Sequence, residues 1–121
     1  MEEFDIAIIG GGPAGIMAAI AASADLNVVL LEKNSSLGSK LLITGGGRCN
    51  ITNEKPIKKL LNSFHDKNFL KHSFYTFTNE MLLDLFRNRG LDFIVEDNNR
   101  VFPETEKSQD ILAILKYYLK D

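Results

Sequence analysis

Three glycines near the N-terminus have the spacing of a phosphate-binding turn. They form Gly10-x-Gly12-x-x-Gly15, which follows the apolar run Ile6–Ile9 and contains Pro13. This context predicts a buried strand, a tight turn and the start of a helix. Gly10 would permit the turn, Gly12 would let the backbone approach a pyrophosphate, and Gly15 would let helix and strand pack closely. The N–H groups at the helix N-terminus favour an anion there.

Glu32 supplies the acid that a dinucleotide-binding βαβ unit requires. It follows a second apolar run, Val28–Leu31, and lies about 20 residues after Gly10, where the ribose-binding acid is expected. Its carboxylate can accept hydrogen bonds from both ribose hydroxyls, and its charge disfavours the 2′-phosphate of NADP. FAD and NAD carry the same ADP moiety, so this fingerprint alone also fits a simple NAD-binding module.

A second glycine-rich segment lies between Lys40 and Asn53 and contains three successive glycines followed by Arg48, Cys49 and Asn50. Successive glycines leave backbone N–H groups accessible to a ligand. Arg48 and Lys40 offer cations for phosphate, and Asn50 can donate and accept at the edge of a heterocycle. We expect a ligand-binding loop here, which an NAD-binding module does not need.

These motifs resemble the bacterial FAD-dependent oxidoreductases described as aminoacetone oxidase-like or bile-acid-inducible reductase-like flavoproteins. The resemblance rests on Gly10–Gly15, on Glu32-Lys33 and above all on the run from Lys40 to Asn53, and it covers essentially the whole chain. A later family motif is matched by Arg100-Val101-Phe102-Pro103, followed by Lys107 and Asp110. The resemblance implies FAD as cofactor and hydride transfer between a small organic substrate and FAD. NAD(P)H or dioxygen would close the cycle.

The resemblance also implies which residues contact FAD. The pyrophosphate would lie against Gly10, Gly12, Pro13, Ala14 and Gly15. The adenosine ribose would be bound by Glu32, with Lys33 beside it. The path from pyrophosphate and ribitol towards the isoalloxazine would be lined by Lys40, Thr44, Gly46, Gly47, Arg48, Cys49 and Asn50. Arg100, Phe102 and Pro103 would lie near the flavin side. The chain departs from the family at Ser39, where arginine is usual, and at Asn99, where glycine is usual.

The pattern predicts an α/β fold, a Rossmann-like FAD-binding βαβ with a helical segment, a short β-hairpin and an incomplete parallel sheet. We expect one domain over residues 1–121, divided into a βαβ with its flavin loop (1–53) and a part made of helices, hairpin and terminal helix (54–121). Residues 33–53 are expected as loop. The expected later elements are helices over 56–64, 66–77 and 79–89, strands over 91–96 and 100–103, and a helix from a capping Ser108 to near Asp121. Gly90 is expected as the left-handed cap after the helix over 79–89, and residues 104–107 are expected as a solvated turn. The inward face of the last helix should be formed by Ile111, Leu112, Leu115 and Leu119. Phenylalanines 64, 69, 74, 77 and 86 are expected in the core.

By resemblance, the third parallel strand would come just beyond Asp121. We therefore expect a truncated FAD-binding domain that is inactive alone and needs a missing C-terminal portion or a complementary chain. A non-catalytic fragment is the alternative.

Composition and charge narrow the class of protein further. The net charge of −2 gives nucleic-acid binding no electrostatic support. The uncharged run Ile6–Ala24 follows an acidic N-terminus and contains glycines, which argues against a signal peptide or a membrane span. The single cysteine, Cys49, excludes an internal disulfide and fits a cytoplasmic protein. We expect Cys49 to serve packing rather than redox chemistry, and neither His65 nor His72 to bind metal.

Overall fold

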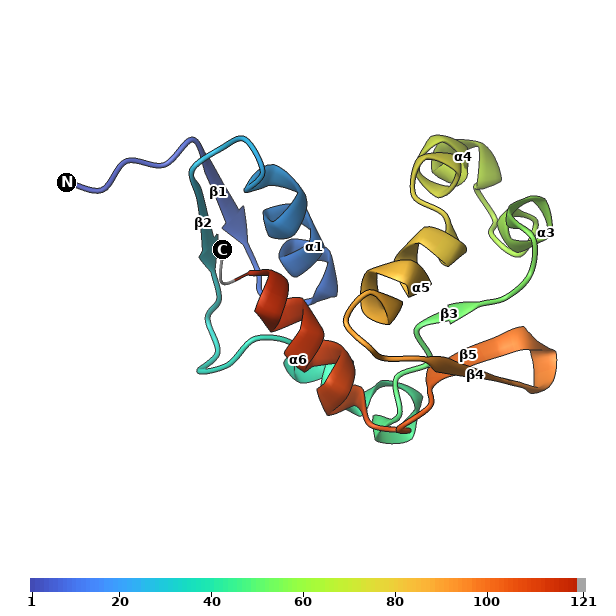
Figure 1. Ribbon diagram of the computed structural model, residues 1–121. Helices are drawn as coiled ribbons and strands as arrows, with labels where there is room; N and C mark the ends of the chain where they lie inside the picture. Colours follow the sequence, from blue (N-terminus) through green and yellow to red (C-terminus); the bar gives the residue numbers. More distant parts are fainter. Residues whose placement is uncertain (120–121) are drawn as a thin grey trace.

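The computed structural model describes residues 1–119, and its N-terminal part is the expected βαβ unit. Strands β1 (Ile6–Ile9) and β2 (Val28–Leu31) pair in parallel, and helix α1 (Pro13–Ala22) packs beside them (Figure 1). Both strands have the bounds that the sequence predicts, because each is a short apolar run that ends at a turn-forming or charged residue. The α/β fold class is thereby confirmed.

Close packing of α1 on β1 depends on a missing side chain. A Cβ atom built on Gly15 would collide with the carbonyl oxygen of Gly10. The helix presents Ile16 and Ala19 as its buried residues, and the small alanine keeps it near the sheet. Gly15 therefore has the packing role expected of the third glycine of the motif.

The second part of the molecule contains a three-stranded antiparallel sheet. Its order is β3-β5-β4, with β3 spanning Thr52–Asn53, β4 Phe93–Glu96 and β5 Arg100–Pro103. A short 3-10 turn, η2 (Asp97–Asn99), closes the hairpin between β4 and β5. Asn98 and Asn99 have φ angles of 62° and 59°, so Asn99 adopts the left-handed conformation that the family's usual glycine would adopt.

The segment 33–53 is more ordered than the sequence suggests. It contains the helix α2 (Ser39–Ile43), the 3-10 turn η1 (Thr44–Gly47) and strand β3. The expectation of a loop throughout was therefore wrong. These elements are too short to show a period in the sequence, and their order comes from packing, since Leu41 is buried and α2 contacts the terminal helix.

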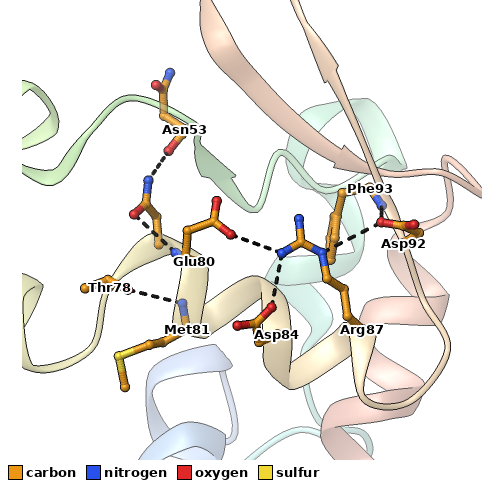
Figure 2. A network of polar contacts seen from close by, with 9 residues as sticks. Asn53, Thr78, Glu80, Met81, Asp84, Arg87, Asp92 and Phe93 are labelled. Carbon is orange, nitrogen blue, oxygen red and sulfur yellow. Dashed lines mark hydrogen bonds and ion pairs between the residues drawn. The ribbon is translucent and has the colours of Figure 1, made fainter.

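Three helices follow, α3 (Ile57–Leu61), α4 (Lys67–Thr76) and α5 (Asn79–Arg87). The Thr78 side chain accepts a hydrogen bond from the Met81 N–H and caps α5 (Figure 2). Beyond the other end of α5, Gly90 has a φ of 82°, as a left-handed cap requires. The α5 helix buries Leu83 and Phe86.

The expected aromatic core is only partly correct. Phe86 is 1% exposed, whereas Phe64 and Phe77 are each 41% exposed and Phe69 is 80% exposed. Helix α4 has no buried residue. Among the described residues it packs mainly against the short α3, which is too small to cover these rings.

Helix α6 (Ser108–Tyr118) runs back over α1 and α2 and completes the core. Its inward face is Ile111, Leu112 and Leu115, as the sequence predicts, with Leu119 packed at the edge of the same cluster. The other buried members of this cluster are Ile16, Leu41, Cys49, Phe86 and Leu91. The predicted helix end near Asp121 lies outside the described residues. None of the helices in residues 1–119 is long and apolar enough to cross a membrane.

Ser108 does not cap α6, contrary to the prediction. The N-cap is Lys107, which makes no side-chain capping bond, and Ser108 is the first helical residue. Its fully buried hydroxyl donates instead to the Leu42 carbonyl at 2.7 Å and so joins α6 to the α2 region.

Replacing Ser108 by alanine removes this bond and leaves the Leu42 carbonyl without its donor. We expect Ser108→Ala to lower the free energy of unfolding by about 1–3 kcal/mol, measured by urea denaturation. The control is Ser23→Ala, because the exposed Ser23 hydroxyl also donates to a backbone carbonyl, at 3.0 Å. It should change stability by less than about 0.5 kcal/mol. Equal effects of the two variants would show that the bond from Ser108 to the Leu42 carbonyl does not stabilise the fold.

Candidate functional site

The phosphate loop presents an open backbone surface at the N-terminus of α1. Gly10 has a φ of 103°, and its N–H donates to the Leu31 carbonyl at 2.7 Å, so the turn follows β1 directly. A Cβ atom on Gly10 or Gly12 would meet no atom within 4 Å. Pro13 begins the helix, and the first turn contains no acidic residue and no side-chain cap. The geometry and the charge of this helix end are those of an anion site.

Glu32 lies against this loop. One carboxylate oxygen accepts the Gly11 N–H at 2.7 Å, and the other accepts the Asn34 N–H at 2.8 Å. The bond from Asn34 and then that from Gly11 lower the pKa of Glu32 from its ordinary value. The group is therefore anionic at neutral pH and fixed beside the phosphate loop, with lone pairs left for hydroxyl donors. Lys33, beside it in sequence, is exposed.

The second glycine loop has a left-handed backbone over most of its length. The φ angles are 56° at Gly45, 67° at Gly46, 86° at Gly47 and 60° at Cys49. A Cβ on Gly45 would come within 2.7 Å of the Asn50 backbone nitrogen, whereas one on Gly46 would meet nothing within 4 Å. The loop thus packs on one side and is open on the other. We call residues Gly45–Cys49 the flavin loop below, after the ligand that the sequence leads us to expect there.

Residues of both motifs line one cavity of about 390 Å³. Its sequence-predicted members are Pro13, Lys40, Thr44, Cys49 and Asn50. The other lining residues are apolar: Met17, Leu41, Ile51, Leu82, Phe86, Ile111 and Leu115. Sequence reasoning assigned several of these to the core alone, because an inward helical face carries no signal that distinguishes core from cavity wall. The lining is mostly apolar with a few polar groups, as in many ligand-binding pockets.

Arg48 does not point to an open anion site. Its guanidinium binds Glu96 through both terminal nitrogens, with Nη1 to Oε1 at 3.3 Å, and Nη2 is 2.9 Å from Glu106 Oε1. It also lies over the Phe102 ring, 4.1 Å from the centroid. The bond to Glu96 raises the pKa of Arg48 and, reciprocally, lowers the pKa of Glu96. The predicted phosphate contact of Arg48 stays a prediction, since these carboxylates already neutralise the cation.

The acids that bind Arg48 were not identified from the sequence. Glu106 was read as part of a solvated turn, and Glu96 as the end of a strand. The bond between Arg48 and Glu96 joins residues that are 48 positions apart, and no local pattern reports such a contact.

The Cys49 thiol is 4% exposed, and its burial raises its pKa. A protonated, buried thiol fits packing better than redox chemistry. Both His65 and His72 are exposed. Within residues 1–119, no group of three or more His, Cys, Asp or Glu residues could hold a metal ion.

Comparison with known proteins gives one family match and several relatives. The model of the HI0933-like protein Rossmann domain matches residues 4–121. A 3-dehydro-bile acid delta(4,6)-reductase from Clostridium scindens is 35% identical over 118 residues, covering 95% of this chain and 28% of that protein. A ribosomal RNA dihydrouridine synthase from Escherichia coli is 34% identical with the same coverages. A mitochondrial dihydrolipoyl dehydrogenase from Caenorhabditis elegans is 39% identical over 74 residues, covering 60% of this chain and 13% of that enzyme.

The chain therefore spans less than a third of the length of these relatives. The family match and the reductase among the relatives confirm the resemblance found in the sequence.

Two glycines of the phosphate loop give a matched pair of tests. We expect Gly15→Ala to lower the free energy of unfolding by about 1–3 kcal/mol, because the new methyl group collides with the Gly10 carbonyl. Gly12→Ala places its methyl group in open space on an extended backbone with φ −80° and ψ −178°. It should lower the free energy of unfolding by less than about 1 kcal/mol. Urea denaturation of both variants provides the comparison. A larger loss at Gly12 than at Gly15 would show that α1 does not pack on β1 in this way.

Proposed function

Because the chain belongs to the HI0933-like family, whose Rossmann domain binds FAD, we propose that it forms the ADP- and flavin-binding part of an oxidoreductase. The complete enzyme would transfer hydride between a small organic substrate and FAD, with NAD(P)H as a candidate co-substrate. Bound FAD would supply the two-electron chemistry. The residues of this chain bind and orient it.

The observation that carries the proposal is the position of the Glu32 carboxylate beside the phosphate loop. Its 2.7 Å bond to the Gly11 N–H sets a fixed negative charge next to the open backbone of Gly10 and Gly12. An ADP moiety has hydroxyl donors on its ribose and a pyrophosphate next to it. The two groups are complementary to this pair of features, and a 2′-phosphate on the ribose would be repelled by Glu32.

The cavity supports FAD over NAD as the ligand. It is lined by Pro13, the first residue of α1, by Lys40, Thr44 and Asn50, and otherwise by apolar side chains. A ligand whose pyrophosphate lies at the phosphate loop can therefore continue into an apolar space beside the flavin loop. The open side of Gly46 leaves backbone within reach of such a ligand. A module for NAD alone does not require this second loop.

The parallel sheet supports the further proposal that function needs more polypeptide, either the C-terminal portion of the fold or a complementary chain. Among residues 1–119, β1 and β2 pair only with each other. Ile9 is 78% exposed and its cross-strand partner Leu31 is 49% exposed. Parallel sheets are stable when both faces are covered and more strands are present. Additional strands and a covering layer would bury these side chains.

The names of two relatives refer to a bile acid and to ribosomal RNA. The named activities belong to proteins more than three times as long as this chain, which aligns with 28% of each of them. The proposal for this chain is accordingly a cofactor-binding function with a small organic substrate bound by the complete enzyme.

The proposal is tested by titrating FAD into the purified chain and following flavin fluorescence. We expect saturable binding that Glu32→Gln weakens by about tenfold or more, because the ribose hydroxyls lose a charged acceptor. The matched control is Glu104→Gln, an exposed acid of the turn before α6, which should bind FAD like the parent chain. NAD at equal concentration should not displace FAD. Displacement by NAD, or equal affinities of the two variants, would contradict the assignment.

A further inference from the structure

The flavin loop holds a backbone conformation that does not persist without support. Its glycines tolerate left-handed φ angles, but Cys49 at 60° is a non-glycine residue in the same region. Such a residue costs free energy and remains in place only where its surroundings determine it. Arg48, with a φ of −98°, is the exception within the loop, and its side chain is the one that reaches the neighbouring hairpin.

The acidic and aromatic partners of the Arg48 guanidinium among residues 1–119 lie in the hairpin and just after it. Glu96 receives both terminal nitrogens, Glu106 receives one, and the guanidinium lies 4.1 Å from the centroid of Phe102. The same ring approaches the other end of the loop, since a Cβ on Gly45 would lie 3.1 Å from it. The hairpin therefore holds the flavin loop near both ends.

Glu96 is the better placed of the two acids. It is the last residue of β4 and pairs across the hairpin with Arg100, so its backbone is fixed by the sheet. Its side chain is 30% exposed, against 55% for Glu106, which lies in a turn. A two-point, partly buried carboxylate–guanidinium contact is stronger and more directional than a single exposed one. Glu96 and the Phe102 ring contact the same guanidinium.

We propose that Glu96 is a positioning residue for the flavin loop: by holding Arg48 against Phe102, it fixes the mostly left-handed backbone of residues 45–49 in the form that receives the cofactor. Glu96 itself does not contact the cofactor and acts through Arg48. The inference rests on the proposed function for its link to FAD. The ordering of the loop can be measured without any ligand.

The first experiment measures amide hydrogen exchange of residues 45–50 by mass spectrometry, on the chain without FAD. We expect Glu96→Gln to accelerate exchange roughly fivefold or more in this segment, while the melting temperature stays near that of the parent chain. Glu96→Asp keeps the charge and should retain most of the protection. This rescue separates a positioning role from a loss of packing.

The matched control is Glu80→Gln. Glu80 pairs with Arg87 on α5 at 3.1 Å, in a network with Asp84 (Figure 2). Each variant therefore loses one carboxylate–guanidinium pair, and only the pair of Glu96 includes a residue of the flavin loop. Unchanged exchange of residues 45–50 in Glu96→Gln, or equal acceleration in the Glu80 variant, overturns the proposal.

The second experiment titrates FAD into the same variants. We expect Glu96→Gln to weaken FAD binding several-fold and the Glu80 and Glu96→Asp variants to bind like the parent chain. Faster exchange with unchanged FAD affinity overturns the positioning role. If the parent chain binds no FAD, the proposal that this chain binds the cofactor without additional polypeptide fails, and the exchange data still decide whether Glu96 orders the loop.

Discussion

The approach of α1 to β1 at Gly15 is the constraint on which the rest of the structure depends. Because no Cβ separates this residue from the Gly10 carbonyl, the helix begins directly at the turn and directs its N-terminus across the end of the strand. The same turn places the Gly11 N–H within 2.7 Å of Glu32. One steric condition thus brings together a helix end, an open glycine backbone and a fixed carboxylate, which are the elements of a nucleotide site.

The two glycine-rich segments solve different problems. In the phosphate loop, glycines leave room, since side chains at Gly10 or Gly12 would meet no protein atom. In the flavin loop, glycines permit a left-handed backbone that must then be held by something outside the loop. The hairpin supplies that support through Arg48, so a cation that the sequence suggests for ligand binding is paired within the protein. Because Glu96 and Glu106 neutralise Arg48, its charge is not free for a ligand.

Features that depend on neighbouring residues in the sequence could be predicted, and features that depend on distant segments could not. The bounds of β1, β2 and β5, the cap at Gly90 and the inward face of α6 are set by neighbours along the chain, and all were predicted. So was the nearness of Glu32 to the phosphate loop, because a βαβ unit determines it locally. The buried bond of Ser108, the helix α2 and the pairing of Arg48 with Glu96 depend on contacts between distant segments and were missed. The aromatic residues in and beside α4 were wrongly expected in the core for a related reason. Ring size predicts burial only where another element covers the ring, and Phe69 is 80% exposed among residues 1–119.

The cavity shares its walls with the hydrophobic core. Leu41, Cys49, Phe86, Ile111 and Leu115 belong both to the buried cluster and to the lining of the cavity. These side chains join α2, α5 and α6, so the space between them exists only while the three helices keep their positions. A ligand group that fills this space would make the packing contacts that the cavity lacks. Because it would bind the folded state and not the unfolded state, it would stabilise the fold by mass action. A ligand bound in this cavity would therefore be coupled to folding through the same apolar residues.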